Sequence, residues 1–471
     1  MIPDLQNDIL HRQPRNFFRR ISLLACSSVL KFVLQLAIII LYSRKLSLTD
    51  YGVYQFIWMY INFFSLLGIF GLSSLVLSVP PAHIREWIGK NKKTVLGFFA
   101  VLNGSAIFFL MLCENYFSVP QTLLLICLLI LQNIMLIAES IAIKNEQEKK
   151  LFGANMIYIC IYGFVHFYLL YNTYSVTILL GCIVAATLLK CILLLYRIKF
   201  SGTATERIPD IGRQWFLLGV NDMLTVLVKW IDKWLILFFL SAAQFALYFN
   251  GTYEIPVFML ILGAVGNISL VEFSKIKKDH NKAVKSLFER SSLLMAAIIF
   301  PSFWFLLFYS TDFFVAFFGT KYLAAIPIFK ITLLMLPARI IYSTTVLQVY
   351  KRTDLILKGS ILDFIIAVIL MFIFYPLWQM KGLAMVFVIS TYIQLAYYLW
   401  HTGRLIKENV SFFFPFKKIL LIMLSTGLLI AACRYGLAAL GILPRLAAGA
   451  SLCAILILSG LRYFYKRSSP A

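Results

Sequence analysis

The chain has 471 residues, of which 61% are hydrophobic and only 13% are charged, and its mean hydropathy is +0.87. A soluble domain carries roughly 25% charged residues, so this chain has too little polar surface for a water-exposed globule and must be surrounded largely by lipid. The net charge of +23 could suit a nucleic-acid-binding protein, but the basic residues are spread between apolar runs and form no basic domain, which excludes that class.

Apolar runs of about 20 residues, long enough to cross a bilayer, follow one another along almost the whole chain. Residues 1–20 are polar and form the expected cytoplasmic N-terminal tail. The expected fold class is therefore an all-α integral membrane protein with about fourteen transmembrane helices. The predicted spans are 21–43, 53–79, 95–113, 122–143, 154–174, 175–196, 214–240, 245–272, 293–310, 325–350, 358–375, 383–402, 418–437 and 446–464.

Basic residues are unevenly distributed between the two sides that this alternation creates. With a cytoplasmic N-terminus, the inner segments hold 31 of the Lys and Arg residues and the outer segments hold 6. Cytoplasmic loops are enriched in Lys and Arg, and a miscounted helix would invert the bias from that point onward. We therefore expect both termini in the cytoplasm and the protein in the bacterial inner membrane.

Two nine-residue stretches, 46–54 and 240–248, follow the same pattern, beginning with Leu-Ser and ending with Tyr. They join predicted helices 1 to 2 and 7 to 8, six helices apart in the same orientation. A parallel repeat about an axis along the membrane normal is a transporter architecture. The sequence therefore predicts two six-helix lobes with a cavity between them. The predicted parts are an N-lobe over 21–196, a cytoplasmic linker over 197–213, a C-lobe over 214–402, and two further helices with a tail over 403–471.

Six basic residues fall inside predicted helices. A charged side chain at a helix centre costs about 2.5–3.5 kcal/mol of insertion free energy. Lys190 and Lys330 lie close to helix ends, from which a lysine can extend to the interface. The other four, which have no such route, are expected to line a polar cavity. They are Lys31, Lys229, Lys233 and Arg339.

The first and seventh predicted helices carry the clearest polar stripes. Gln35 follows Lys31 by one helical turn on the same face. In the seventh helix, Asp222, Lys229 and Lys233 fall within about 40° of one another around the axis. Asp232 could pair with Lys229, so at least one lysine is expected to face water or an anionic ligand. The alternative is that ion pairs between the lobes satisfy all of these charges.

The sequence contains no motif of covalent or metal-dependent catalysis, such as GxSxG, HExxH or a P-loop. The predicted outer loops are short, which leaves no periplasmic domain to process a substrate. A transporter without a cofactor is therefore expected, and the lone His166 is interpreted as a core residue.

Three short motifs resemble those of Wzx-type flippases, which move O-antigen and capsule repeat units and belong to the multidrug/oligosaccharidyl-lipid/polysaccharide exporter superfamily. The first is Leu-Tyr-Ser-Arg-Lys-Leu-Ser-Leu-Thr-Asp-Tyr-Gly-Val-Tyr at 41–54. The second is Trp-Ile-Asp-Lys-Trp-Leu-Ile at 230–236 with Phe-Ala-Leu-Tyr at 245–248, and the third is Phe-Phe-Gly-Thr-Lys-Tyr at 317–322. The resemblance covers roughly residues 15–402. The two extra C-terminal helices resemble MurJ-type lipid II flippases instead.

The resemblance implies alternating access that moves an undecaprenyl-pyrophosphate-linked oligosaccharide from the cytoplasmic to the periplasmic leaflet, with a polysaccharide polymerase as a possible partner. Lys and Arg would supply charge-assisted donors to the pyrophosphate. The predicted substrate site comprises Lys31, Gln35, Arg44, Lys229, Lys233 and Arg339. The resemblance also implies coupling to a Na⁺ or H⁺ gradient through Asp222, Asp232, Asp363 and Thr391.

Three alternatives stay open. A lipid II flippase would share the architecture. A cation-coupled multidrug antiporter is disfavoured because its organic cations require an acidic site, and a membrane oligosaccharide polymerase or ligase is disfavoured by the short outer loops.

Overall fold

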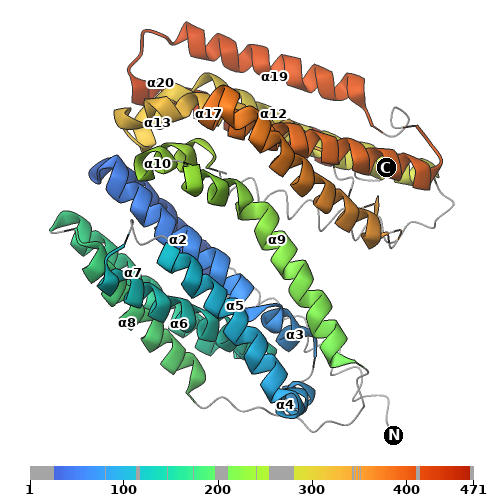
Figure 1. Ribbon diagram of the computed structural model, residues 1–471. Helices are drawn as coiled ribbons and strands as arrows, with labels where there is room; N and C mark the ends of the chain where they lie inside the picture. Colours follow the sequence, from blue (N-terminus) through green and yellow to red (C-terminus); the bar gives the residue numbers. More distant parts are fainter. Residues whose placement is uncertain are drawn as a thin grey trace, which may run out of the picture. The chain divides into compact units, whose positions relative to one another are not determined.

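A computed structural model describes most of the chain, and the described residues are helical with no strand among them (Figure 1). Eleven of the described helices are long and apolar enough to cross a membrane. The predicted fold class, an all-α multi-pass membrane protein, is therefore confirmed. The described residues are 26–79, 81–112, 117–145, 147–172, 174–196, 210–239, 241–253, 281–341, 344, 346–347, 350, 352–409 and 414–466.

The chain divides into two compact units, residues 1–243 and 244–471. The first unit contains the helix Cys26–Lys45, α2 (Leu48–Ile69), α3 (Leu72–Ser78), α4 (Pro81–Lys90), α5 (Lys92–Leu112), α6 (Val119–Lys144), α7 (Glu148–Tyr171), α8 (Val176–Leu195) and α9 (Ile211–Phe239). The division falls inside α10 (Ala242–Gly251). The second unit contains α12 (Asn281–Phe308), α13 (Ser310–Phe317), the 3-10 helix η2 (Thr320–Ala325), α14 (Ile326–Leu333), α15 (Met335–Ala338), α17 (Thr353–Ile406), α19 (Phe416–Gly436) and α20 (Ile442–Lys466).

These units do not follow the predicted lobes. Helix α9, which the sequence assigns to the C-lobe, packs against α2 and α3 in the first unit. Helices α19 and α20, assigned to a separate C-terminal segment, pack against α12 in the second unit. The predicted lobe boundaries stay a prediction.

Two predicted spans are interrupted. The span predicted over 53–79 breaks at Phe70 and Gly71, which both have positive φ angles, 34° and 70°. The span predicted over 325–350 is instead a series of short pieces, η2, α14 and α15, and the last ends one residue after Pro337. Proline cannot supply the backbone N–H that a continuous helix needs. The span predicted over 245–272 coincides with α10 only at its start, because residues 254–280 lie outside the described residues.

The two helices predicted over 358–375 and 383–402 form one helical hairpin, labelled α17. Gln379 has non-helical backbone angles, φ 48° and ψ −131°, and marks the bend. Tyr398 donates to the Ile356 carbonyl at 2.9 Å, and Gln394 donates to the Gly359 carbonyl at 3.2 Å. The partner position in the first half moves toward its start as the position in the second half moves toward its end, so the two halves run antiparallel.

Contacts between distant helix ends join residues that the sequence places on the same side of the membrane. Lys144 donates to the Leu77 carbonyl at 2.8 Å, and both are predicted at the inner side. Lys45 lies over the Tyr171 ring, and both are predicted at the outer side. These contacts agree with the alternation. The count of fourteen and the cytoplasmic termini stay predictions.

In the described part of the two matched stretches, a helix begins directly after the serine. Ser47 caps α2 by accepting a hydrogen bond from the Asp50 backbone N–H at 3.0 Å, and Ser241 directly precedes α10 in the same register. The final tyrosines of the two stretches, Tyr54 and Tyr248, are both buried. The sequence match therefore reflects a shared helix N-terminus, in which a serine, a preferred N-cap residue, directly precedes the helix.

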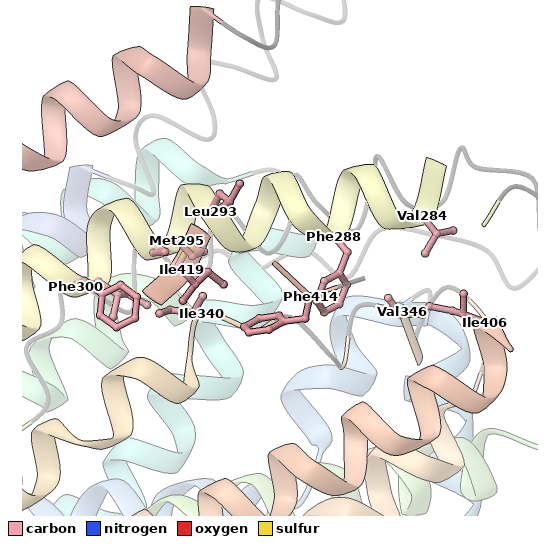
Figure 2. Close-up of a cluster of buried hydrophobic side chains, with 12 residues drawn as sticks. Val284, Phe288, Leu293, Met295, Phe300, Ile340, Val346, Ile406, Phe414 and Ile419 are labelled. Atoms are coloured by element: carbon pink, nitrogen blue, oxygen red, sulfur yellow. The ribbon is translucent and has the colours of Figure 1, made fainter. Parts of the chain in front are cut away.

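One core cluster of the second unit forms where α12 meets α19 and the end of α17 (Figure 2). Phe288, Met295 and Phe300 of α12 are almost fully buried in a cluster that includes Ile419 of α19. Three glycines let the C-terminal helices approach closely, because a Cβ on any of them would overlap a neighbour, as small residues do at membrane helix contacts. They are Gly427 against Trp304, Gly449 against Tyr309 and Gly460 against Ala297.

Candidate functional site

The first helix, Cys26–Lys45, carries a polar stripe on its packed face. Ser27, Lys31, Gln35, Ile38 and Tyr42 lie within about 80° around the helix axis. Ser27, Ile38 and Tyr42 are buried, whereas Lys31 and Gln35 are exposed. This face is thus buried at Ser27 and again from Ile38 onward, and it is exposed between them at Lys31 and Gln35, which the sequence assigns to a substrate site.

Lys190 is not a snorkelling residue, and that prediction is wrong. Its side chain is only 1% exposed and forms an ion pair with Glu139 of α6, with 2.5 Å between Nζ and Oε1. The ammonium also lies 5.0 Å from the centre of the Tyr158 ring. A lysine this deeply buried needs such partners because an isolated charge is very costly away from water.

Lys31 lies within electrostatic range of this pair. The charge of Lys190 repels its ammonium and the carboxylate of Glu139 attracts it. Among the described residues, Lys31 forms no hydrogen bond or ion pair of its own. The three side chains together carry one net positive charge, and that charge is located on the exposed lysine.

A layer of aromatic residues closes the first unit beyond Tyr42. His166 of α7 is fully buried, with its Nδ1 2.8 Å from the Tyr162 carbonyl and its Nε2 3.3 Å from the Tyr54 hydroxyl. A carbonyl can only accept, so Nδ1 carries the proton and Nε2 accepts from Tyr54. With both nitrogens engaged inside the packed layer, His166 is the core residue that the sequence analysis expected.

On α9, the predicted stripe is described only in part. Asp222 accepts a hydrogen bond from the Ser74 hydroxyl at 2.8 Å, which ties α9 to α3. Lys233 lies 5.5 Å from the centre of the Trp230 ring on its own helix. Lys229 and Asp232 lie on α9, but their side chains are outside the described residues.

The other predicted substrate residues lie apart from Lys31 along the chain. Arg44 is exposed at the end of the first helix. Arg339 directly follows α15 in the second unit. Of the predicted set, the described residues therefore bring Lys31 and Gln35 together on one open face.

The predicted coupling residues of the second unit do lie close together. The side chains of Asp363 and Ser390, from the two halves of the α17 hairpin, lie close enough to interact electrostatically, and Thr391 follows Ser390 in the sequence. One carboxylate oxygen of Asp363, Oδ1, is buried with no hydrogen-bond partner among the described residues. An ion pair between Asp363 and Arg339, which would give Asp363 a structural role, is not found in the described part of the chain.

Sequence reasoning missed a second buried charge cluster. Asp312 of α13 is 2% exposed and is bound by Arg445 through two bonds, Nη2 to Oδ1 at 2.6 Å and Nε to Oδ2 at 2.9 Å. Arg434 Nε lies 3.6 Å from the same carboxylate. All three residues are predicted at or near the outer side. Their pairing had no local signal, because more than 120 residues separate Asp312 from either arginine.

The profile of the polysaccharide biosynthesis protein family matches residues 41–327, which is more than half of the chain. The chain belongs to this family. A comparison with curated proteins found no match.

Two solved structures resemble this polysaccharide biosynthesis protein. One is the lipid II flippase MurJ in an inward closed conformation, with a TM-score of 0.66 and 18% identity over 92% of this chain and 97% of that chain. The other is a MATE-family multidrug resistance transporter of the MOP superfamily in an inward-facing conformation, with a TM-score of 0.55 and 11% identity over 80% of this chain and 95% of that chain. The superfamily fold expected from the sequence motifs is confirmed.

Proposed function

We propose that this chain is a flippase that moves an undecaprenyl-pyrophosphate-linked oligosaccharide repeat unit from the cytoplasmic to the periplasmic leaflet of the bacterial inner membrane. Family membership in polysaccharide biosynthesis and the shared fold of the MurJ and MATE transporters support a transport role in glycan assembly. The single observation that carries the substrate is Lys31, an exposed lysine of a helix that could span the membrane, which has no ion-pair partner in the part of the chain that the structure describes.

The chemistry of that stripe suits a pyrophosphate. An anion that leaves water needs charge-assisted donors, and an ammonium supplies three. The neighbouring amide of Gln35 offers further donors and acceptors, which suit the phosphate or the first sugar. The same observation disfavours the multidrug antiporter, because Glu139 is neutralised by Lys190 and the open face presents a cation. A lipid II flippase stays the alternative, since lipid II also carries a pyrophosphate, and a polymerase that receives the glycan is the partner we would expect.

The test is surface display of the glycan in a strain that lacks this gene and carries each variant, normalised to the membrane level of the protein. Replacing Lys31 with alanine removes a charge-assisted bond and should weaken substrate affinity by about 10- to 150-fold. Lys31→Arg should retain much of the display, and Lys31→Glu should abolish it by repelling the phosphates. Lys229→Ala and Lys233→Ala should lower display if these lysines line the same cavity.

Lys330→Ala is the matched control, because Lys330 is an exposed lysine of α14 outside the predicted site. Full display from Lys31→Glu at a normal protein level would refute the pyrophosphate role of Lys31. Rescue of a strain depleted of its lipid II flippase, without rescue of the glycan-display strain, would instead favour lipid II as the substrate.

We further propose that transport is coupled to a Na⁺ or H⁺ gradient through Asp363, with Thr391, Asp222 and Asp232 as the other coupling residues. The unpartnered Oδ1 of Asp363 supports a bound cation at that atom, since buried carboxylate oxygens otherwise find donors. Asp363→Asn should leave the membrane level of the protein unchanged and should remove the dependence of transport on the gradient. This is measured in proteoliposomes with an imposed sodium or pH gradient. A sharp fall in folded protein, with coupling intact in the remainder, would assign Asp363 a structural role instead.

A further inference from the structure

We propose that Glu139 and Lys190 are positioning residues that keep Lys31 uncompensated, so that these three side chains form a subsite of one net positive charge for a phosphate-type anion. The inference rests on the proposed function, because it identifies which part of the first unit would receive the pyrophosphate. Its central claim is electrostatic. Glu139 is held by the buried lysine and is thereby withheld from the exposed one.

Burial decides which lysine keeps the carboxylate. The Lys190 side chain is 1% exposed, and the Glu139 side chain is 26% exposed. Lys31 is exposed, whereas among the described residues Lys190 has the Glu139 carboxylate and the face of the Tyr158 ring to stabilise its charge. Separating a buried pair leaves an uncompensated charge, which is strongly unfavourable. The Glu139–Lys190 pair is therefore the stable arrangement.

The competing arrangement is an ion pair between Glu139 and Lys31. Lys31 lies one helical turn beyond Ser27, which accepts a hydrogen bond from Asn155 of α7 at 3.4 Å, and one turn further along α7 the Tyr158 ring contacts Lys190. The open part of Glu139 leaves its carboxylate partly accessible. If Lys190 were neutral, Glu139 would lose its partner and would turn to Lys31. The subsite would then carry no net charge and would not attract an anion.

This competition predicts an unusual order of phenotypes. Lys190→Met should lower the proposed transport although it removes a residue that is almost fully buried. Adding Glu139→Gln to that variant should restore transport, because the double variant again leaves Lys31 as the only charge. The charge exchange Glu139→Lys with Lys190→Glu keeps the subsite at one net positive charge and should also be active.

The deciding experiment measures the local potential directly and does not depend on transport. Lys31→Cys is placed in a full-length chain that lacks the native cysteines. Its reaction rates with an anionic sulfonatoethyl and a cationic trimethylammonioethyl methanethiosulfonate are compared in membranes. Lys190→Met should lower the ratio of anionic to cationic rates by about tenfold or more, because a bare carboxylate then lies near the thiol. The Glu139→Gln, Lys190→Met double variant should return the ratio to that of the intact pair.

A ratio that stays within about twofold of the intact pair's value in Lys190→Met would overturn the positioning role. If Lys190→Met does not accumulate in the membrane, the double variant and the charge exchange still test the proposal. A ratio in the double variant that differs from that of the intact pair would contradict it. The arms separate the two hypotheses. A shifted ratio with unchanged glycan display supports the charged subsite and contradicts its use for the pyrophosphate, whereas an unshifted ratio contradicts the subsite whatever the display. The proposed function fails separately, if the intact chain does not restore display in the strain that lacks this gene.

Discussion

Replacing Asp312 with alanine should destabilise the protein more than any other single removal of a charge among the described residues. The carboxylate is 2% exposed and is the shared partner of Arg445 and Arg434. Removing it leaves two half-buried guanidinium groups facing each other without compensation, and breaking a buried pair costs about 3–5 kcal/mol. Because Asp312 lies on α13 and the arginines lie on α19 and α20, these two C-terminal helices should be the first to separate from the rest of the second unit.

The measurement is the fraction of purified protein that stays monodisperse in detergent after heating, read as an apparent melting temperature. Asp354→Ala is the matched control, since Asp354 also pairs with an arginine, Arg352, but at an exposed position where ion pairs contribute little. Adding Arg445→Ala to Asp312→Ala should recover part of the loss, because it removes one stranded charge. Equal melting temperatures for Asp312→Ala and Asp354→Ala would show that the cluster is not a structural clamp.

Substituting Gly71 with alanine should be nearly as damaging, for a reason of backbone geometry. Gly71 has φ +70°, a conformation that costs a residue with a Cβ about 1–2 kcal/mol. A Cβ there would also overlap the backbone of Gly219 on α9, and backbone cannot rotate away as a side chain can. Overpacking of this kind costs about 1–3 kcal/mol, so we expect a total loss of about 2–5 kcal/mol.

Gly104→Ala provides the comparison for this substitution. Gly104 lies in α5 with open space where a Cβ would be placed, and alanine is the better helix former. Its apparent melting temperature should therefore stay level or rise, while that of Gly71→Ala falls. A Gly71→Ala protein as stable as the parent would mean that α3 and α9 can separate at the helix break without cost.

The helix break also explains the position of Asp222. Gly71 brings α3 against α9 at Gly219, and three residues further along each helix Ser74 donates its hydrogen bond to Asp222. The sequence placed Asp222 on a stripe with two lysines of its own helix and on a list of coupling residues. In the structure its carboxylate has a partner on α3, and its coupling role stays a proposal.

Local features of the chain are sufficient to predict the membrane environment, most helix positions and the candidate Lys31–Gln35 stripe. These follow from local quantities: the number of apolar residues needed to cross a bilayer, the bias of Lys and Arg between loops, and the spacing of polar residues along one helix. A local rule also explains the interruption near Pro337, although 325–350 is predicted as one span, because proline lacks the backbone N–H of a continuous helix. Local rules could not give the break at Phe70 and Gly71, which depends on the close approach of α9.

Which charged side chains meet depends on how the helices pack. Lys190 looked like a residue at a helix end that could reach the interface, yet it pairs with Glu139, 51 residues earlier on another helix. Asp312 looked like an outer loop residue, yet it is buried between two arginines. The physical reason is the low dielectric of the membrane interior. A charge there must find a partner, and which partner it finds depends on how helices from distant parts of the chain pack, a choice that spacing within one helix does not encode.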